Sequence, residues 1–568
     1  MQTTRFFKLI FTGMAAVVLA SCSKTNTQGK LIPKDAAVVI ELDGKSLTDK
    51  LPWAEIKQNA LFMEMNADTS LPTTFKSLLS NPDNAGIDTK ADLLFFVVKD
   101  SVGGYIGFEG NVKDEKAFKT FNEEATKNGA ASEKDGVSFI SKYPVCVGYT
   151  KEKFVYIFDA PQLAQMDELS RRMKQDSIAV KSVSGRDIGA ACKAIFALQE
   201  SNSLAKDEKF TSLMKETGDI RFWTNGEQLS KSAASAGALA MMNLEKFYKG
   251  YINTGTLNFD NGKMLMKAKT YASEDMVNLF KKYSGGKIDE EMIKHMPDKD
   301  VMAIMAFNFK PEAIRDLIKM TGLDGLINMG VQKLGFTIDD FIKANKGDIV
   351  FGLSDLVLHT DTTTYNFKDQ PQNMSVRQKP DFNFIFSASI GDKNAFNKIV
   401  EAGRKLGSKQ FSDSSKMPIA YNLNSNYFVM SNTKENADQY LAKASTNFDF
   451  ISKISGEPFG GYINIQSLLK AFGSMATKDS SAKIAYDASL KMWDNVLWKG
   501  GNYSDGGIQQ TVEINLLDKT TNSLKQLNAY TSKFSELYKV QRKKQQEEKM
   551  AFYDFQEDLI TPPPFKTQ

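Results

Sequence analysis

Two histidines and three cysteines are the side chains of this sequence that could most readily do chemistry near neutral pH. His295 and His359 could each serve as a general base, but no Gly-x-Ser-x-Gly motif supplies a serine nucleophile. Cys146 could be a nucleophile, yet Ala420 stands at its aligned position in a second, similar half of the chain, which favours strand packing. Cys192 lies among apolar helix formers and is interpreted as a core residue. The sequence therefore assigns no catalytic residue.

Metal and cofactor motifs are also missing from the sequence. There is no His-Glu-x-x-His, no paired Cys-x-x-Cys and no aspartate-rich calcium loop, so we expect no metal site and no cofactor. The glycine-rich stretch 102–110 leads into a further strand rather than a helix, so it is predicted to be a hairpin and not a phosphate-binding loop. Carboxylate pairs that cleave glycosidic bonds stay possible, because spacing in sequence does not give spacing across a sheet.

The first cysteine, Cys22, has a different context. Arg5 and Lys8 precede an apolar run at 9–20, after which the chain turns polar, which is the order of a secretory signal. The run is shorter than the roughly 20 residues that a membrane-spanning helix needs. The triplet at 19–21 directly before Cys22 resembles the bacterial lipobox, in which the cysteine thiol receives a diacylglycerol. An ordinary cleaved signal with an incidental Cys22 is the alternative.

Composition is typical of a folded, exported body. Of 568 residues, 42% are hydrophobic and 25% charged, which is enough apolar material for a large core. The formal charge of +4 falls when the signal is removed, so no concentrated basic face and no nucleic acid partner are expected. Because only Cys146 and Cys192 remain after Cys22, disulfides cannot form a framework, although one bridge is possible in an oxidising compartment.

Blocks of sequence recur in the same order along the chain. The clearest match aligns 105–118 with 383–396 without a gap. An ordered series of such matches indicates a duplication. The other five pairs of matching blocks begin at residues 32 and 296, 91 and 347, 144 and 418, 219 and 459, and 257 and 501.

These blocks share one local pattern of strand, hairpin, strand and capped helix. Asn261–Gly262 is predicted to be a tight hairpin turn, because this pair accepts positive φ angles. Asp114, Asp392 and Ser273 each precede a helical stretch and are predicted N-caps. The predicted fold class is α+β, with two similar repeats, each a largely antiparallel β-sheet with helices packed on one face.

Domain boundaries follow from these signals. We expect a lipoprotein signal peptide at 1–21, a tether at 22–31, a first α+β repeat at 32–290, a second at 291–530, and a charged helix with a proline-rich tail at 531–568. Helix-face spacing predicts helices within 311–335 and 162–175, and close helix packing is expected for the small-residue run at 232–244. The polar stretch 361–381 lacks periodicity and is expected to be an exposed loop.

The lipobox, the opening at 32–44, the segment at 81–97 and the repetition together resemble a family of Bacteroidota envelope lipoproteins labelled domain of unknown function 4836. The resemblance implies location and fold, and it brings no catalytic residues. In that phylum, lipoproteins sent to the cell surface tend to carry acidic residues just after the lipidated cysteine, and 23–30 has none. We therefore expect an outer-membrane anchor that faces the periplasm.

The expected function is that of a non-catalytic binding or scaffold protein of the cell envelope, held on the membrane by lipid on Cys22 and offering a surface to an envelope protein or polymer. The alternative is a hydrolase that acts on an envelope polymer or glycan, for which a deep cleft with converging acids is the minimum requirement.

Overall fold

A computed structural model describes most of the chain and divides it into two compact units. The first unit comprises 1–42, 83–217 and 221–229, and the second comprises 43–82, 218–220 and 230–568. The predicted repeat boundaries at 290 and 530 stay predictions, because these units follow contacts rather than sequence similarity. The described residues are 28–67, 80–100, 102–127, 129–161, 163, 185–230, 245–297, 300–365, 373–410, 419–442, 446–476, 480–537 and 539.

The first unit contains an antiparallel sheet. Its strands run in the order β4, β5, β6, β7, β3, β2, β1 and β8. Their bounds are β1 Val38–Leu42, β2 Leu93–Val98, β3 Tyr105–Asn111, β4 Ala130–Lys134, β5 Val137–Lys142, β6 Val145–Tyr149, β7 Lys153–Asp159 and β8 Ile220–Asn225. Because β2 and β3 pair antiparallel around 99–104, the predicted hairpin in the glycine-rich stretch is confirmed.

Short helices accompany this sheet. Among them, α6 packs its buried Phe118 against Phe154 of β7, with ring centroids 5.1 Å apart. The helix α8 packs on β5, β6 and β7. The helices are α6 Glu115–Ala125, α8 Ile188–Phe196, α9 Glu208–Leu213 and α10 Gly226–Ser230, with 3-10 turns η1 Pro82–Ala85, η2 Glu200–Asn202 and η3 Leu204–Lys206.

The second unit contains a longer antiparallel sheet. Its order is β9, β10, β18, β17, β16, β11, β12, β13, β15 and β14. The bounds are β9 Ile252–Asp260, β10 Lys263–Tyr271, β11 Val301–Asn308, β12 Asn345–Tyr365, β13 Asn373–Ile390, β14 Ala420–Leu423, β15 Tyr427–Ser431, β16 Phe459–Asn464, β17 Trp493–Ser504 and β18 Gly507–Leu516.

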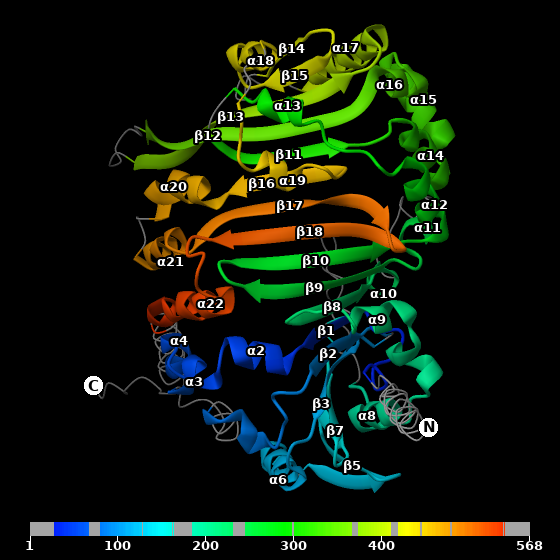
Figure 1. The fold of residues 1–568 in the computed structure, drawn as a ribbon, viewed down its shortest axis with the longest axis vertical. Coiled ribbons are helices and arrows are strands. Elements are labelled where there is room, and N and C mark those ends of the chain that lie inside the picture. The colour runs from blue at the N-terminus through cyan, green and yellow to red at the C-terminus, as the bar shows by residue number, and fades with distance from the viewer. Residues whose placement is uncertain are drawn as a thin grey trace, which may run out of the picture. The chain divides into compact units, whose positions relative to one another are not determined.

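Helices lie at both ends of these strands. Figure 1 shows α20, α21 and α22 at one end and α12, α14, α15 and α16 at the other. The helices are α2 Gly44–Lys50, α3 Trp53–Ile56, α4 Ala60–Asn66, α11 Glu245–Tyr248, α12 Glu274–Tyr283, α13 Glu290–Lys294, α14 Glu312–Thr321, α15 Asp324–Leu334, α16 Ile338–Ala344, α17 Lys393–Gln410, α18 Lys434–Leu441, α19 Ile451–Ile454, α20 Ile465–Ala476, α21 Ser480–Leu490 and α22 Ser523–Ser532.

The predicted α+β class and the antiparallel sheets are confirmed. In the second unit, core residues pack on both faces of the sheet. Leu497 belongs to the core cluster with residues of α13, α18 and α19. Ile514 packs instead with residues of α22. Leu497 pairs with Glu513, the neighbour of Ile514, so Leu497 and Ile514 point to opposite faces.

Strand pairing recurs in the two units. The series β6, β7, β3, β2, β1 and β8 has the same pairing order as β14, β15, β13, β12, β11 and β16. Aligned aromatic residues also make the same contact, since Phe118 meets Phe154 and Phe396 meets Phe428, at centroid distances of 5.1 and 5.4 Å. This is the arrangement that a duplication would produce.

The local predictions that depend on caps and turns are confirmed. Asp114 accepts a hydrogen bond from the amide of Ala117 at 3.0 Å, and Asp392 accepts one from Ala395 at 2.7 Å. Ser273 accepts one from Met276. Asn261–Gly262 joins β9 to β10 with Gly262 at a φ of 69°. The helices predicted within 311–335 are α14 and α15.

The expected exposed loop at 361–381 is wrong in part. Residues 361–365 extend β12 and 373–381 extend β13, with Thr360 opposite Gln378 and Thr364 opposite Met374. These residues are polar and lack the alternation of apolar residues that predicts a strand. Hydrogen bonds between the two strands stabilise the long hairpin that they form. The predicted helices at 162–175 and 232–244 lie almost entirely outside the described residues, as does the tail at 540–568.

A buried carboxyl in the first unit gives a test of its core. Glu109 of β3 is 1% exposed; one oxygen lies 3.5 Å from Nζ of Lys153, and the other has no hydrogen-bond partner. Burial raises the pKa of Glu109, and the Lys153 charge only partly offsets this.

We therefore expect Glu109→Gln to become increasingly stabilising relative to wild type as pH rises above about 4, the pKa of an unfolded glutamate. The folded carboxyl retains a proton that the unfolded chain has released, so wild-type stability falls through this window, whereas glutamine does not titrate. Urea unfolding of both proteins at several pH values measures the difference. A stability difference that stays constant with pH would contradict the assignment.

Candidate binding groove

Three asparagines form a row across neighbouring strands of the second unit. Asn464 of β16 pairs with Asn495 of β17, which pairs with Asn515 of β18. Directly opposed residues project from the same face of a sheet. Nδ2 of Asn515 donates to Oδ1 of Asn495 at 2.9 Å. The register thus places a line of side-chain amides across the ends of three strands.

A second row lies beside the first on the same face. Tyr462 pairs with Leu497, and Leu497 pairs with Glu513. These residues are two positions away from Asn464, Asn495 and Asn515 along each strand, and side chains two residues apart share a face. The sheet therefore offers an apolar and aromatic floor next to a row of amides.

The segment 447–453 forms a wall over this floor. Phe448 and Phe450 stack at a centroid distance of 5.2 Å, and Phe450 stacks on Tyr462 at 4.3 Å. Both phenylalanines are largely buried, so the stack anchors the segment to the sheet. The exposed neighbours Asn447 and Asp449 are thereby held at the rim.

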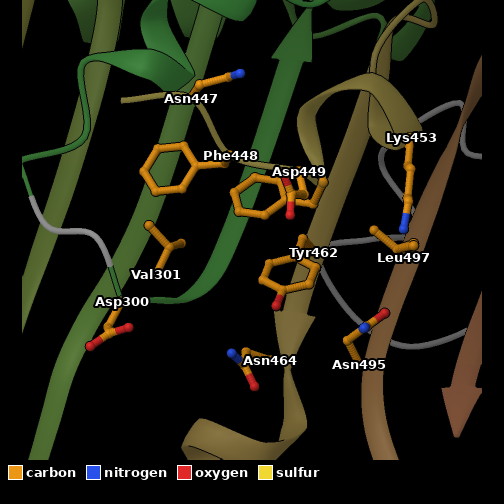
Figure 2. Close-up of a pocket in the computed structure, with 11 residues that line it drawn as sticks. Asp300, Val301, Asn447, Phe448, Asp449, Lys453, Tyr462, Asn464, Asn495 and Leu497 are labelled. Carbon is orange, nitrogen blue, oxygen red and sulfur yellow. The ribbon is translucent and has the colours of Figure 1, made fainter. Parts of the chain in front are cut away.

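Between wall and sheet lies a pocket of about 430 Å³. Figure 2 shows its side chains, with Tyr462, Asn464 and Asn495 on the strands and Phe448 and Lys453 on the wall. A second hollow of about 330 Å³ shares Lys453 and Leu497 with the first. We call the two together the groove. Its lining is Asp300, Val301, Asn447, Phe448, Asp449, Phe450, Lys453, Tyr462, Asn464, Asn495, Leu497, Trp498, Lys499, Thr511 and Glu513.

Charges of both signs line the groove. Asp300, Asp449 and Glu513 are opposed by Lys453 and Lys499. Burial alone would raise the pKa of Glu513, but hydrogen bonding to Lys263 and Asn515 outweighs it and holds the pKa below its usual value. The mixture favours neither a strongly anionic nor a strongly cationic ligand.

The amide nitrogens of the groove are free to donate. Oδ1 of Asn464 accepts from the amide of Ser467 at 3.0 Å, and Oδ1 of Asn495 accepts from Asn515. Within the described residues, neither Asn464 nor Asn495 donates from Nδ2 to a protein acceptor. Amide N–H groups beside a tyrosine and a lysine can hydrogen bond to hydroxyl and carbonyl oxygens of a polar ligand.

The corresponding place in the first unit is filled. Asn225, like Asn464, caps the helix that follows its strand, and Trp223 stands two residues before it, as Tyr462 does before Asn464. Trp223 is 1% exposed and packs edge-on against Phe210 at 5.8 Å. The open groove is thus a feature by which the second unit differs from the first.

Neither of the two histidines lines the groove. His295 is buried at the end of α13, edge-on to Tyr427 and Tyr440 at 5.4 and 5.5 Å. His359 is exposed on β12, with Nε2 at 3.8 Å from the Asp381 carboxylate, in a separate hollow.

The cysteines divide into two cases. Cys146 and Cys192 are both buried and come together between β6 and α8. Their burial is what we expected of two residues that pack in the core. Cys22, the predicted lipidation site, lies outside the described residues. The part of the chain that the structure describes contains no group of three or more metal-ligating side chains. No helix within it has the length and apolar character to cross a membrane.

Sequence reasoning singled out none of the groove residues. Their positions in one row follow from strand register, which local sequence does not reveal. The available signal was an asparagine in each of three consecutive strand segments, at 464, 495 and 515. Asparagine is depleted in strands, so its recurrence there could have marked a site.

Three crystal forms of TP0453 share 10% identity with the chain; they cover 43%, 47% and 43% of it and 79%, 90% and 77% of their own lengths, with TM-scores of 0.23, 0.24 and 0.20. At these TM-scores the likeness supports no functional argument. No curated protein matches the chain. A family model matches residues 29–442, so the chain belongs to the family described as Domain of unknown function (DUF4836).

Proposed function

We propose that this chain is a lipid-anchored protein of the bacterial cell envelope that binds a polar polymer, a glycan strand, in the groove of its second unit without cleaving it. The groove is the observation that carries the proposal. Two adjacent hollows that share Lys453 and Leu497 lie over β16, β17 and β18, and this succession suits an extended chain better than a small molecule.

The chemistry of the lining supports a glycan as the ligand. Sugar rings present hydroxyl and acetamido groups at their edges and C–H groups on their faces. Asn464, Asn495 and Lys453 can donate to the edges, Asp449 can accept from them, and Tyr462 can contact a face. Because charges of both signs line the groove, an uncharged or weakly charged polymer is favoured.

The location rests on the amino-terminal sequence. The small-residue triplet before Cys22 supports lipidation there, and two acyl chains would hold the protein on a bilayer stably. For a lipoprotein of Bacteroidota, the source that the resemblance implies, the tether at 23–30 without acidic residues supports an outer-membrane anchor that faces the periplasm. A protein placed there would meet envelope glycans.

We expect the double variant Asp449→Ala, Lys453→Ala to bind cell-wall glycan strands at least about tenfold more weakly than wild type, since it removes one charged acceptor and one charged donor. Both residues are exposed, so the fold should persist. Fluorescence anisotropy with end-labelled strands measures the affinity. The matched control, His359→Ala with Asp381→Ala, removes an exposed pair from the separate hollow and should bind like wild type.

An assay for new reducing ends, on the same glycan strands, addresses the hydrolase alternative. Asp300 and Asp449 both line the groove, but among the described residues no hydrogen bond joins either one to the other or to a base. Binding without new reducing ends is the result we expect. If the wild-type protein releases reducing ends and Asp300→Asn or Asp449→Asn abolishes this release, the protein is a hydrolase and not only a binding protein. If wild type and the Asp449→Ala, Lys453→Ala variant bind the strands equally well, the groove is not the binding site.

A further inference from the structure

Cys146 and Cys192 come from different elements but meet in the core of the first unit. Cys146 lies on β6, and Cys192 lies on α8, which packs on β5, β6 and β7. Both residues are 0% exposed. Both are free thiols in the structure. Cys146 pairs with Ile157 of β7, and Sγ of Cys192 lies 3.9 Å from the carbonyl oxygen of Val155, two residues along the same strand, so the two thiols lie close together.

The second unit has the same junction of helix and strand with a different link. There α18 packs on β14 and β15, and Nδ2 of Asn422 donates to Asp438 of α18 at 2.7 Å. Ala420 stands where Cys146 stands in the first unit, by the alignment of the two blocks. A polar side-chain contact thus joins β14 to α18 in the second unit. In the first unit, the cysteine pair joins the corresponding elements, β6 and α8.

We propose that Cys146 and Cys192 form a disulfide bond when the chain folds under oxidising conditions. The oxidant is a disulfide, either of a small thiol or of an oxidoreductase. The thiolate of one cysteine attacks one sulfur of the donor, which releases the first donor thiol and leaves a mixed disulfide. The thiolate of the other cysteine then attacks the protein sulfur of that mixed disulfide, and the second donor thiol leaves. Two electrons and two protons pass from the cysteines to the donor.

Both sulfurs are enclosed in the folded unit, so the donor must react before α8 docks on the sheet. In the folded unit, the contact with Cys192 lowers the pKa of Cys146, and the same contact together with burial raises the pKa of Cys192. These shifts arise only once α8 has docked, so either cysteine can be the first to attack the donor.

The test uses the full chain with Cys22→Ala, so that only these two thiols remain. The chain is denatured, refolded with a mixture of reduced and oxidised glutathione or with a reductant alone, then denatured again with an alkylating agent and weighed by mass spectrometry. After oxidative refolding we expect no alkylated cysteine, a loss of two hydrogen masses, and a cross-linked peptide that reduction separates. Alkylation of both cysteines after oxidative refolding would overturn the proposal.

A thermal measurement separates a bridge from simple packing. A bridge between 146 and 192 closes a loop of about 45 residues, so reduction should lower the unfolding midpoint of the first unit by on the order of 10 °C. Cys146→Ala, which installs the residue of the second unit, should unfold at the same temperature with and without reductant. A wild-type midpoint that is insensitive to reductant would contradict the bridge.

Discussion

Replacing Cys22 with alanine is expected to move the protein from the membrane fraction to the soluble fraction almost completely. If Cys22 carries two acyl chains, each buried methylene contributes about 0.8 kcal/mol to membrane binding, and two chains together give stable anchoring. Without the thiol no diacylglycerol can be attached. Membrane fractionation of cells that make wild type or Cys22→Ala, with mass spectrometry of the amino-terminal peptide, measures the change.

Cys146→Ala is the matched control for this prediction, because it removes a cysteine from the core and leaves Cys22 in place. It should stay with the membrane. The lipid anchor would be contradicted if Cys22→Ala fractionates like wild type and the wild-type amino-terminal peptide carries no lipid. Cys22 would then be an incidental residue after an ordinary signal peptide.

Replacing Asp219 with alanine should lower the free energy of unfolding of the second unit by about 3–5 kcal/mol, the usual cost of breaking a buried ion pair from one side. The Asp219 side chain is 1% exposed and lies 2.5 Å from Nζ of Lys50. It also accepts from Oγ of Ser46 at 2.5 Å and from the amide of Phe259 at 2.6 Å. The substitution leaves a partly buried ammonium and a buried amide without their acceptor.

Urea unfolding followed by tryptophan fluorescence measures this loss. The control is Asp49→Ala, which breaks the pair between Lys45 and Asp49, whose side chains are 76% and 63% exposed. Exposed pairs contribute about 1 kcal/mol or less, so this variant should unfold close to wild type. Equal losses from the two variants would show that the Asp219 network does not stabilise the second unit.

Features set by neighbouring residues were accessible from the sequence. The caps at Asp114 and Asp392 and the turn at Asn261–Gly262 depend on side chains and backbone within a few positions of one another. The expected loop at 361–381 was wrong in part for the opposite reason. Its residues carry no apolar alternation, and their strand structure comes from pairing across a long hairpin.

The groove lay beyond sequence reasoning because it depends on which residues face each other across strands. Asn464, Asn495 and Asn515 lie far apart along the chain and become neighbours only through the register of β16, β17 and β18. The contrast between Trp223 and Tyr462 was likewise hidden, since both are aromatic residues in aligned strands. What differs is the packing around them, with Trp223 enclosed and Tyr462 at the edge of a hollow.

The most direct measurement for the groove is a calorimetric titration of the wild-type chain with cell-wall glycan strands of increasing length. We predict that affinity rises with strand length until the ligand spans both hollows and then levels off, and that Asp449→Ala with Lys453→Ala weakens binding most for the strands that span both, because Lys453 lies where the hollows meet. Absence of binding at every length, or an affinity that does not change with length and is the same in the variant, would contradict the account.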